Sequence, residues 1–196
     1  MTARWRDIAV AGHSGDAVTA RSGLVDSDPV SRELALGALS RLGELTDDDL
    51  RAALADGAPS VRRRAAMIAG KRPDLSLRAV LDDLDVTVVE AAAWACGEQE
   101  HVDDDVLHVL IELGVSSGDP LIREACAAAL GAIGDPRGLA TILHGCTDKS
   151  AVRRRAVLAL APFDGEAVDA ALQAALGDHD WQVRQAAEDV LRAAQG

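Results

Sequence analysis

Aromatic residues are scarce in this chain of 196 residues, which has no Tyr, one Phe and three Trp. The strands of β-sheets draw on aromatic and β-branched side chains, so this scarcity disfavours sheet-rich folds. The chain instead contains 38 Ala and 24 Leu, two residue types that lead the helix-propensity ranking. The composition therefore predicts an all-α protein.

Basic side chains are outnumbered, because 20 Lys and Arg face 32 Asp and Glu and leave a net charge of −12. This charge argues against nonspecific binding of phosphates by the whole surface. Only two of the basic residues are Lys. The excess of Arg favours planar, bidentate pairing with carboxylates.

Cysteines are few, and long apolar runs are absent. An odd number of three Cys, without a C-x-x-C pair, argues against a disulfide framework and for a reducing compartment. Charges at Arg4, Arg6 and Asp7 fall where a signal peptide needs an apolar core, and no apolar run approaches membrane-spanning length. We therefore expect a cytoplasmic protein that does not enter a membrane.

A block of Val, Arg, two variable residues, a small residue and further apolar positions recurs along the chain. Its copies begin at Ser31, Val61, Val88, Ile122, Val152 and Val183, at intervals of 27 to 34 residues. Positions zero, four, seven and eight of the block fall on one helical face and are mostly apolar, which indicates a helix with one buried stripe. Asp28 before Pro29 and Asp119 before Pro120 are N-cap signals for these helices. The interval predicts helical hairpins, with the block as the second helix of each.

Shorter amphipathic segments between the blocks are the predicted first helices. We expect them at residues 46–55, 74–82, 103–114, 136–145 and 165–176. The predicted organisation is a single solenoid over residues 1–196. It comprises a capping helix at 1–14 and repeats at 15–44, 45–72, 73–98, 99–134, 135–163 and 164–196.

These blocks resemble HEAT-like repeats, especially the short bacterial kind first named from phycocyanobilin lyases. Residues 129–137 resemble the inter-repeat signature of that family, and residues 178–191 resemble its second-helix signature. The resemblance covers about residues 15–195 and implies a right-handed α-solenoid of about six helical hairpins. It implies an extended binding surface but no particular function.

Enzymes that resemble this architecture have requirements with which the sequence can be compared. Deoxyhypusine hydroxylase needs His-Glu dipeptides for a di-iron centre, and none of the five His here precedes a Glu. Alkylpurine DNA glycosylases of HEAT-like repeats present a basic groove with aromatics, against a net charge of −12 here. Two alternatives remain open, an accessory lyase-type subunit that binds a chromophore or cofactor and a weak DNA-binding repeat protein.

Candidate catalytic and metal-binding groups have simpler explanations. Asp104 and His108 stand one helical turn apart near His101, but successive Asp at a helix start also suit the helix macrodipole. Two Cys occupy buried columns of the repeat, and Cys146 has no apparent His or Asn partner. We therefore expect no catalytic residue, no metal site and no cofactor.

Arginine occupies position one of five blocks, and the third block has Val89 there. These residues are Arg32, Arg62, Arg123, Arg153 and Arg184. Each is expected to face a turn that carries an acid, and the acids are Asp28, Asp56, Asp119, Asp148 and Asp180. The pattern predicts a ladder of Arg–Asp pairs that links the repeats.

Position six of the block points away from the buried stripe, yet it is apolar in the four middle copies. These copies hold Met67, Trp94, Ala128 and Leu158. Position two beside it carries charges of both signs, at Arg63, Glu90, Glu124 and Arg154. An apolar row with charged borders suits a bound peptide or amphipathic helix.

We therefore predict that these eight residues form a partner-binding site centred on Trp94, on the concave face of the solenoid. The predicted function is a non-catalytic interaction or scaffold module whose partner is another protein. In an alternative interpretation, Trp94 leans sideways onto a neighbouring helix and is part of the packing. The oligomeric state does not follow from the sequence.

Overall fold

The computed structural model describes residues 4–73 and 75–194, and these segments contain helices and no strand. The prediction of an all-α protein is confirmed. The chain divides into two compact units, Met1–Ala92 and Ala93–Gly196. Within the described segments, no helix is both long and apolar enough to cross a membrane.

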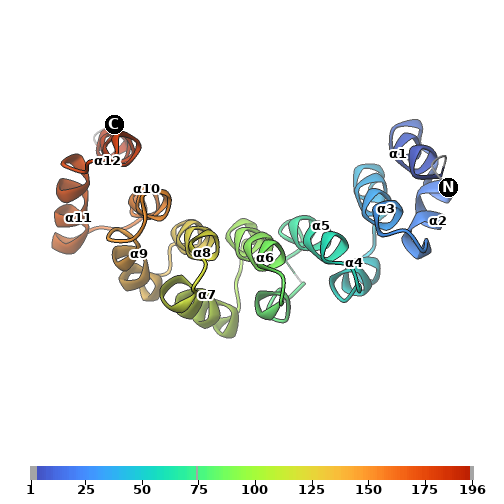
Figure 1. The fold of residues 1–196 in the computed structure, drawn as a ribbon, viewed down its shortest axis with the longest axis horizontal. Helices are drawn as coiled ribbons and strands as arrows, with labels where there is room; N and C mark the ends of the chain where they lie inside the picture. The colour runs from blue at the N-terminus through green and yellow to red at the C-terminus, as the bar shows by residue number, and fades with distance from the viewer. Residues whose placement is uncertain (1–3, 74, 195–196) are drawn as a thin grey trace. The chain divides into compact units, whose positions relative to one another are not determined.

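The first unit is built from short helices in hairpins (Figure 1). Its elements are α1 (Arg4–Ser14), α2 (Ala17–Ser22), the 3-10 helix η1 (Gly23–Val25), α3 (Pro29–Leu42), α4 (Asp47–Leu54), α5 (Pro59–Ala69) and the 3-10 helix η2 (Val80–Asp82). Helix α3 lies at its centre and packs against α1, α2 and α5. The boundary between the two units falls within α6 (Val86–Glu98).

The second unit repeats the hairpin plan. Its further elements are α7 (Asp104–Ser116), α8 (Pro120–Ile133), the 3-10 helix η3 (Pro136–Gly138), α9 (Leu139–Gly145), α10 (Ser150–Ala159), α11 (Glu166–Leu176) and α12 (Trp181–Ala193). In Figure 1 the second helices α8, α10 and α12 form one row, and the first helices α7, α9 and α11 form the other. Helix α10 packs between α8 and α12.

Side chains at the predicted helix starts act as caps. Asp28 and Asp119 accept hydrogen bonds from the backbone N–H groups two residues later, and a Pro follows each of them at the first helical position. Thr46 and Asp49 form a reciprocal capping box at the start of α4. Local sequence therefore fixes where α3, α4 and α8 begin.

Small residues at the repeat positions let the second helices approach closely. A Cβ atom on Gly131 of α8 would lie 2.6 Å from Cβ of Ala159 on α10. Ala65, Ala92 and Ala156 at position four are fully buried. The predicted buried stripe is therefore the packing surface of these helices.

The predicted first helix at 74–82 is wrong. Residue 74 lies outside the described residues, and the rest of this segment forms turns followed by η2. The interval from Val61 to Val88 is the shortest between blocks, so too few residues remain for a full helix. Leu75, Leu77 and Leu81 are nevertheless buried, as the side chains of a first helix would be.

The predicted N-terminal helix is present as α1, and residues 1–3 of the predicted range 1–14 lie outside the described residues. Ile8 and Ala11 of α1 are buried. A Cβ atom on Gly12 would lie 2.8 Å from Cα of Ala38, which shows how closely α1 approaches α3. Helix α1 therefore covers one side of α3.

Candidate functional site

Arginine–aspartate pairs recur near the N-terminal ends of the second helices. Each Arg donates from Nε and Nη2 to the two carboxylate oxygens of the Asp in the following repeat, over 2.5 to 2.9 Å. The pairs are Arg32–Asp56, Arg62–Asp83, Arg123–Asp148 and Arg153–Asp178. The third guanidinium nitrogen of each Arg donates to a backbone carbonyl of the turn before its own helix. The predicted ladder is therefore present, and it links neighbouring repeats within each unit.

The partners of the ladder differ in part from the prediction. Asp28, Asp119 and Asp180 are not ladder acids, because each caps the N-terminus of its own helix. The acids that pair lie two residues before the caps, or at the equivalent place in the turn. Hydrogen bonds from Arg123 and Arg153 lower the pKa of Asp148 and of Asp178 to about 2.

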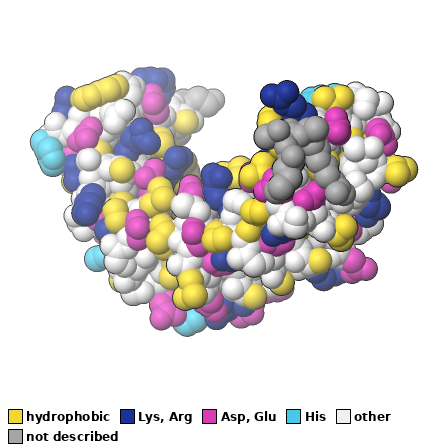
Figure 2. All heavy atoms as spheres, turned by 45° about the vertical axis from the view of Figure 1, so that its right-hand side comes forward, with side chains coloured by type: hydrophobic (Ala, Val, Ile, Leu, Met, Phe, Trp, Pro, Cys, Tyr) yellow, Lys and Arg dark blue, Asp and Glu magenta, His cyan; other side chains and the backbone are white. Residues whose placement is uncertain are grey.

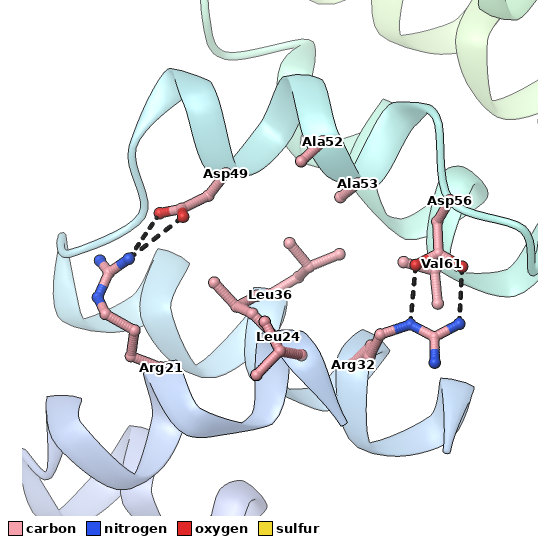
Figure 3. A pocket seen from close by; sticks show the side chains of 10 residues that line it. Arg21, Leu24, Arg32, Leu36, Asp49, Ala52, Ala53, Asp56 and Val61 are labelled. Atoms are coloured by element: carbon pink, nitrogen blue, oxygen red, sulfur yellow. Dashed lines mark hydrogen bonds and ion pairs between the residues drawn. The ribbon is translucent and has the colours of Figure 1, made fainter. Parts of the chain in front are cut away.

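A cavity of about 280 Å³ opens in the first unit between two such ion pairs (Figure 3). Figure 3 shows Arg21 and Arg32 at its two ends, each with a guanidinium group directed at a carboxylate. Arg21 contacts Asp49 at 3.0 and 3.2 Å, and Arg32 contacts Asp56 at 2.8 Å. Between them the lining is apolar, from Leu24, Leu36, Ala52, Ala53 and Val61.

The charges at this cavity neutralise each other. Thr46 and Ala58 donate further backbone N–H bonds to Asp49 and Asp56. The side-chain charges at the rim therefore have partners within the fold, and the lining between them is apolar. Its lining includes no His, Cys or Ser that could serve as a base or a nucleophile.

A second candidate surface lies on the second helices of the second unit. We call it the Leu158 face and define it by Glu124, Ala128, Arg154, Arg155, Leu158 and Trp181, which come from α8, α10 and α12. Leu158 is 38% exposed although α10 packs between α8 and α12. Large exposed apolar side chains that gather on one surface commonly mark interaction sites.

Leu158 separates two hollows on this face. One hollow, of about 510 Å³, is lined by Ala128, Gly131, Arg155 and Pro162 together with Leu158. The other, of about 220 Å³, is lined by Arg154, Leu158, Trp181 and Gln185. The structure therefore brings together four of the eight predicted binding residues, namely Glu124, Ala128, Arg154 and Leu158.

Trp94 is 41% exposed on α6 and lies in the second unit. It lines neither hollow of the Leu158 face. Its helix approaches α8 closely, because a Cβ atom on Gly97 would lie 3.0 Å from Cα of Ala129. Trp94 is thus partly packed and partly accessible, and its predicted role in binding stays a prediction.

Three of the predicted residues belong to the first unit. Arg63 is exposed, whereas Met67 and Glu90 are partly buried. None of the three lines the cavity of Figure 3. Their predicted participation in one binding surface with Leu158 stays a prediction.

The predicted set of eight residues did not include Trp181 and Arg155. Trp181 is 64% exposed at the start of α12 and lines one hollow. It stands four residues before Gln185, so it lies one helical turn from position two on the same face. Extending the predicted surface by one helical turn towards the N-terminus of the last repeat's second helix would have included Trp181.

The groups considered for catalysis and metal binding are scattered. His101 and His108 are exposed, and Asp104 pairs with Arg137 at 2.9 Å. Within residues 4–73 and 75–194, no three His, Cys, Asp or Glu side chains are grouped so that they could bind a metal ion. Burial raises the pKa of Cys146 to about 11, so its thiolate is scarce near neutral pH.

Charges of both signs are mixed on the face of the molecule drawn in Figure 2. On the face that Figure 2 shows, the coloured side chains of Lys and Arg alternate with those of Asp and Glu and form no continuous basic stripe. Nucleic acids are bound through many basic groups aligned along the phosphate backbone. The face drawn does not have that pattern.

Comparison with known proteins defines the class of protein. The family model described as HEAT repeats matches residues 73–161 and 107–192, which together span more than half of the chain. The chain therefore belongs to the HEAT-repeat family, and the resemblance noted in the sequence is confirmed. Its fold is an α-solenoid of helical hairpins. No curated protein matches this sequence.

Solved structures align with this chain at low sequence identity. Human deoxyhypusine hydroxylase in complex with glycerol aligns with a TM-score of 0.50 and 19% identity, over 94% of this chain and 75% of that one. An engineered protein aligns with a TM-score of 0.48 and 19% identity, over 96% of this chain and 87% of that one. At this identity the likeness to the hydroxylase concerns the fold alone.

Proposed function

We propose that this chain is a non-catalytic interaction module that binds a segment of another protein, as a peptide or an amphipathic helix. The observation that carries the proposal is the Leu158 face, where an exposed Leu stands between two hollows and an exposed Trp borders one of them. Apolar anchors of a partner commonly fill such hollows, surrounded by a polar rim. HEAT repeats suit this role because stacked hairpins present an extended surface.

The chemistry of the described side chains supports a role without catalysis. A nucleophile needs an adjacent base and a lowered pKa, whereas burial raises the pKa of Cys96 and Cys126 to about 12. The acids whose pKa values fall to about 2 are each paired with an Arg, Asp148 and Asp178 in the ladder and Asp135 with Arg137, so they are not free to move protons. These groups have structural roles in the proposed module.

Site-specific photo-crosslinking tests the proposal. A photoreactive amino acid is placed at Leu158, at Trp94 or, as a control, at Val18, which is 82% exposed in the first unit. After irradiation in an extract of the source cells, we expect one partner segment to be crosslinked from Leu158 and Trp94 and not from Val18. A pattern from Val18 identical to that from Leu158 would contradict a specific site.

The captured segment is then synthesised and its affinity is measured. Trp94→Ala and Leu158→Ala should each weaken binding at least tenfold, because truncation of buried anchors commonly costs about 2 kcal/mol or more. Circular dichroism should show that both variants keep the helix content of the parent. Unchanged affinity in both variants would show that the segment binds elsewhere.

A further inference from the structure

The two arginines of the Leu158 face differ from those of the ladder. In the ladder, Arg123 and Arg153 bind a carboxylate through two hydrogen bonds, and their side chains are 12% and 13% exposed. Arg154 and Arg155 are 37% and 42% exposed. The latter two therefore keep much of their guanidinium surface accessible.

Both of these arginines face one and the same acid. Glu124 Oε1 lies 3.9 Å from Arg154 Nη2 and 3.7 Å from Arg155 Nε. Both distances exceed the roughly 3.2 Å limit of an N–H···O hydrogen bond. A single carboxylate at this distance cannot neutralise two guanidinium groups, so positive charge remains on a chain whose net charge is −12.

Asp189, the second acid near the two hollows, already accepts hydrogen bonds from its own helix. Asp189 lines the smaller hollow, and its Oδ1 accepts hydrogen bonds from Gln185 Nε2 and Arg192 Nη1, both at 3.0 Å. The larger hollow has no acidic residue in its lining, where Arg155 is the charged residue. The cavity of Figure 3 differs in this respect, because each arginine there has its own carboxylate.

We propose that the occupant of the Leu158 face is an acidic amphipathic segment of a partner protein. This inference rests on the proposed function and specifies its partner. Two apolar side chains of the segment enter the hollows on either side of Leu158, and Asp or Glu residues next to them pair with Arg154 and Arg155. Guanidinium groups bind carboxylates in a planar, bidentate geometry, and the like charge of a basic segment would be repelled.

The same arginines favour a peptide over a nucleic acid. Glu124 lies between them and the larger hollow is walled by Ala128, Leu158 and Pro162, which offer aliphatic contacts. A nucleic acid carries a phosphate charge at every nucleotide, so Glu124 and Asp189 would repel it, whereas a peptide can place its few acids at Arg154 and Arg155 alone. We therefore treat binding of an oligonucleotide as an outcome against the proposal.

Selection from a random library of displayed peptides of 16 residues tests the partner class. The full chain is the bait, and clones that also bind a Leu158→Asp variant are discarded. We expect the remaining sequences to carry two apolar residues three or four positions apart, with an excess of Asp and Glu beside them. Unfolding curves of the Leu158→Asp variant verify that it is folded.

The selected peptides are then measured by fluorescence anisotropy. Arg155→Glu and Arg154→Glu should each weaken an acidic peptide at least tenfold, and the matched control Arg51→Glu, an exposed Arg in the first unit, should not. A peptide with Lys in place of its acids should bind the Arg154→Glu, Arg155→Glu double variant better than it binds the parent. A destabilised variant would bind every peptide more weakly. Tighter binding of the Lys peptide to the double variant than to the parent can therefore be attributed to the changed charge.

The possible results separate this inference from the proposed function. Peptides without an acidic excess, still dependent on Leu158, would overturn the acidic class and leave the interaction module standing. Selection of no Leu158-dependent peptide would overturn both. Binding of a single-stranded oligonucleotide, weakened by Arg155→Glu, would replace the acidic segment with a nucleic acid.

Discussion

At the scale of single residues, the recurrent feature is the Arg side chain that joins one repeat to the next. Its guanidinium group contacts a carboxylate with two nitrogens and a backbone carbonyl with the third. The side chains of Arg123 and Asp148 are 12% and 13% exposed, so solvent screens this pair less than it screens a surface pair. Such a pair stabilises both the turn and the contact between repeats.

Replacement of Arg123 with Ala should destabilise the protein by about 2 kcal/mol, because it removes these hydrogen bonds and leaves Asp148 without its partner. Arg51→Ala is the control, because Arg51 pairs with Asp48 on the open surface, and it should cost less than about 0.5 kcal/mol. Urea unfolding of both variants provides the comparison. Equal midpoints for the two would mean that the ladder adds nothing to stability.

Sequence reasoning at this scale located the four Arg that pair, but it also included Arg184, which donates to the backbone carbonyls of Asp178 and His179. It did not locate every acid. The turns hold two Asp close together, such as Asp178 and Asp180, and spacing alone does not say which one caps the helix and which one pairs. The assignment depends on the side-chain directions within the turn. Those directions follow from packing between repeats, which a helical periodicity does not describe.

At the scale of elements, the hairpins depend on close approach between second helices. The contact of α8 with α10 is close at Gly131, where a Cβ atom would lie 2.7 Å from Cα and 2.9 Å from the carbonyl oxygen of Ala159. Backbone atoms cannot rotate away as the end of a side chain can. The gain of helix propensity from Gly to Ala, about 1 kcal/mol, is therefore smaller than the cost of the clash.

We accordingly expect Gly131→Ala to destabilise the second unit by about 2 kcal/mol. Gly118→Ala is the matched control in the same unit, because a Cβ atom there would meet nothing within 4 Å. That variant should be neutral or slightly stabilised, by up to about 1 kcal/mol, because Ala restricts the unfolded chain. Thermal unfolding measures both variants, and a stabilised Gly131→Ala would refute the close packing.

The elements were predicted well where the repeat is regular and less well where it is not. The N-cap signals and the apolar stripe identified the second helices, because both depend on neighbours within the same helix. The segment at 74–82 lacks a helix because the interval between blocks is too short there, and its apolar residues alone suggested one. The hollows beside Leu158 could not be predicted, since they arise between helices that are distant in sequence.

At the scale of the whole molecule, the acids of the ladder make stability depend on pH. Hydrogen bonds from Arg side chains lower the pKa values of Asp56, Asp83, Asp148 and Asp178 relative to the unfolded chain. A carboxyl group whose pKa is lower in the folded state stabilises that state at pH values above its unfolded pKa of about 3.9. This stabilisation is lost as the pH falls through the folded value.

These four acids should therefore leave the urea midpoint nearly constant from pH 7 to about pH 5. They should make it decline from about pH 4 to pH 2. The decline should be smaller in an Arg123→Ala, Arg153→Ala double variant, because Asp148 and Asp178, whose pKa values are about 2, lose their partners. A midpoint that stays level down to pH 2 in the parent would contradict the assigned pairs.

The buried cysteines allow the opening of the helix stack to be timed without any engineered label. Cys96 on α6 and Cys126 on α8 are fully buried, and a Cβ atom on Gly114 of α7 would lie 3.4 Å from Cβ of Cys126. An alkylating reagent can reach either thiol only when the surrounding helices separate. In the closed form the packed helices block the reagent, and burial keeps the thiol protonated and therefore unreactive. The rate at which each thiol is modified in native buffer therefore reports how often the helices around it open locally. Mass spectrometry of the two cysteine-containing peptides would give both modification rates from one sample.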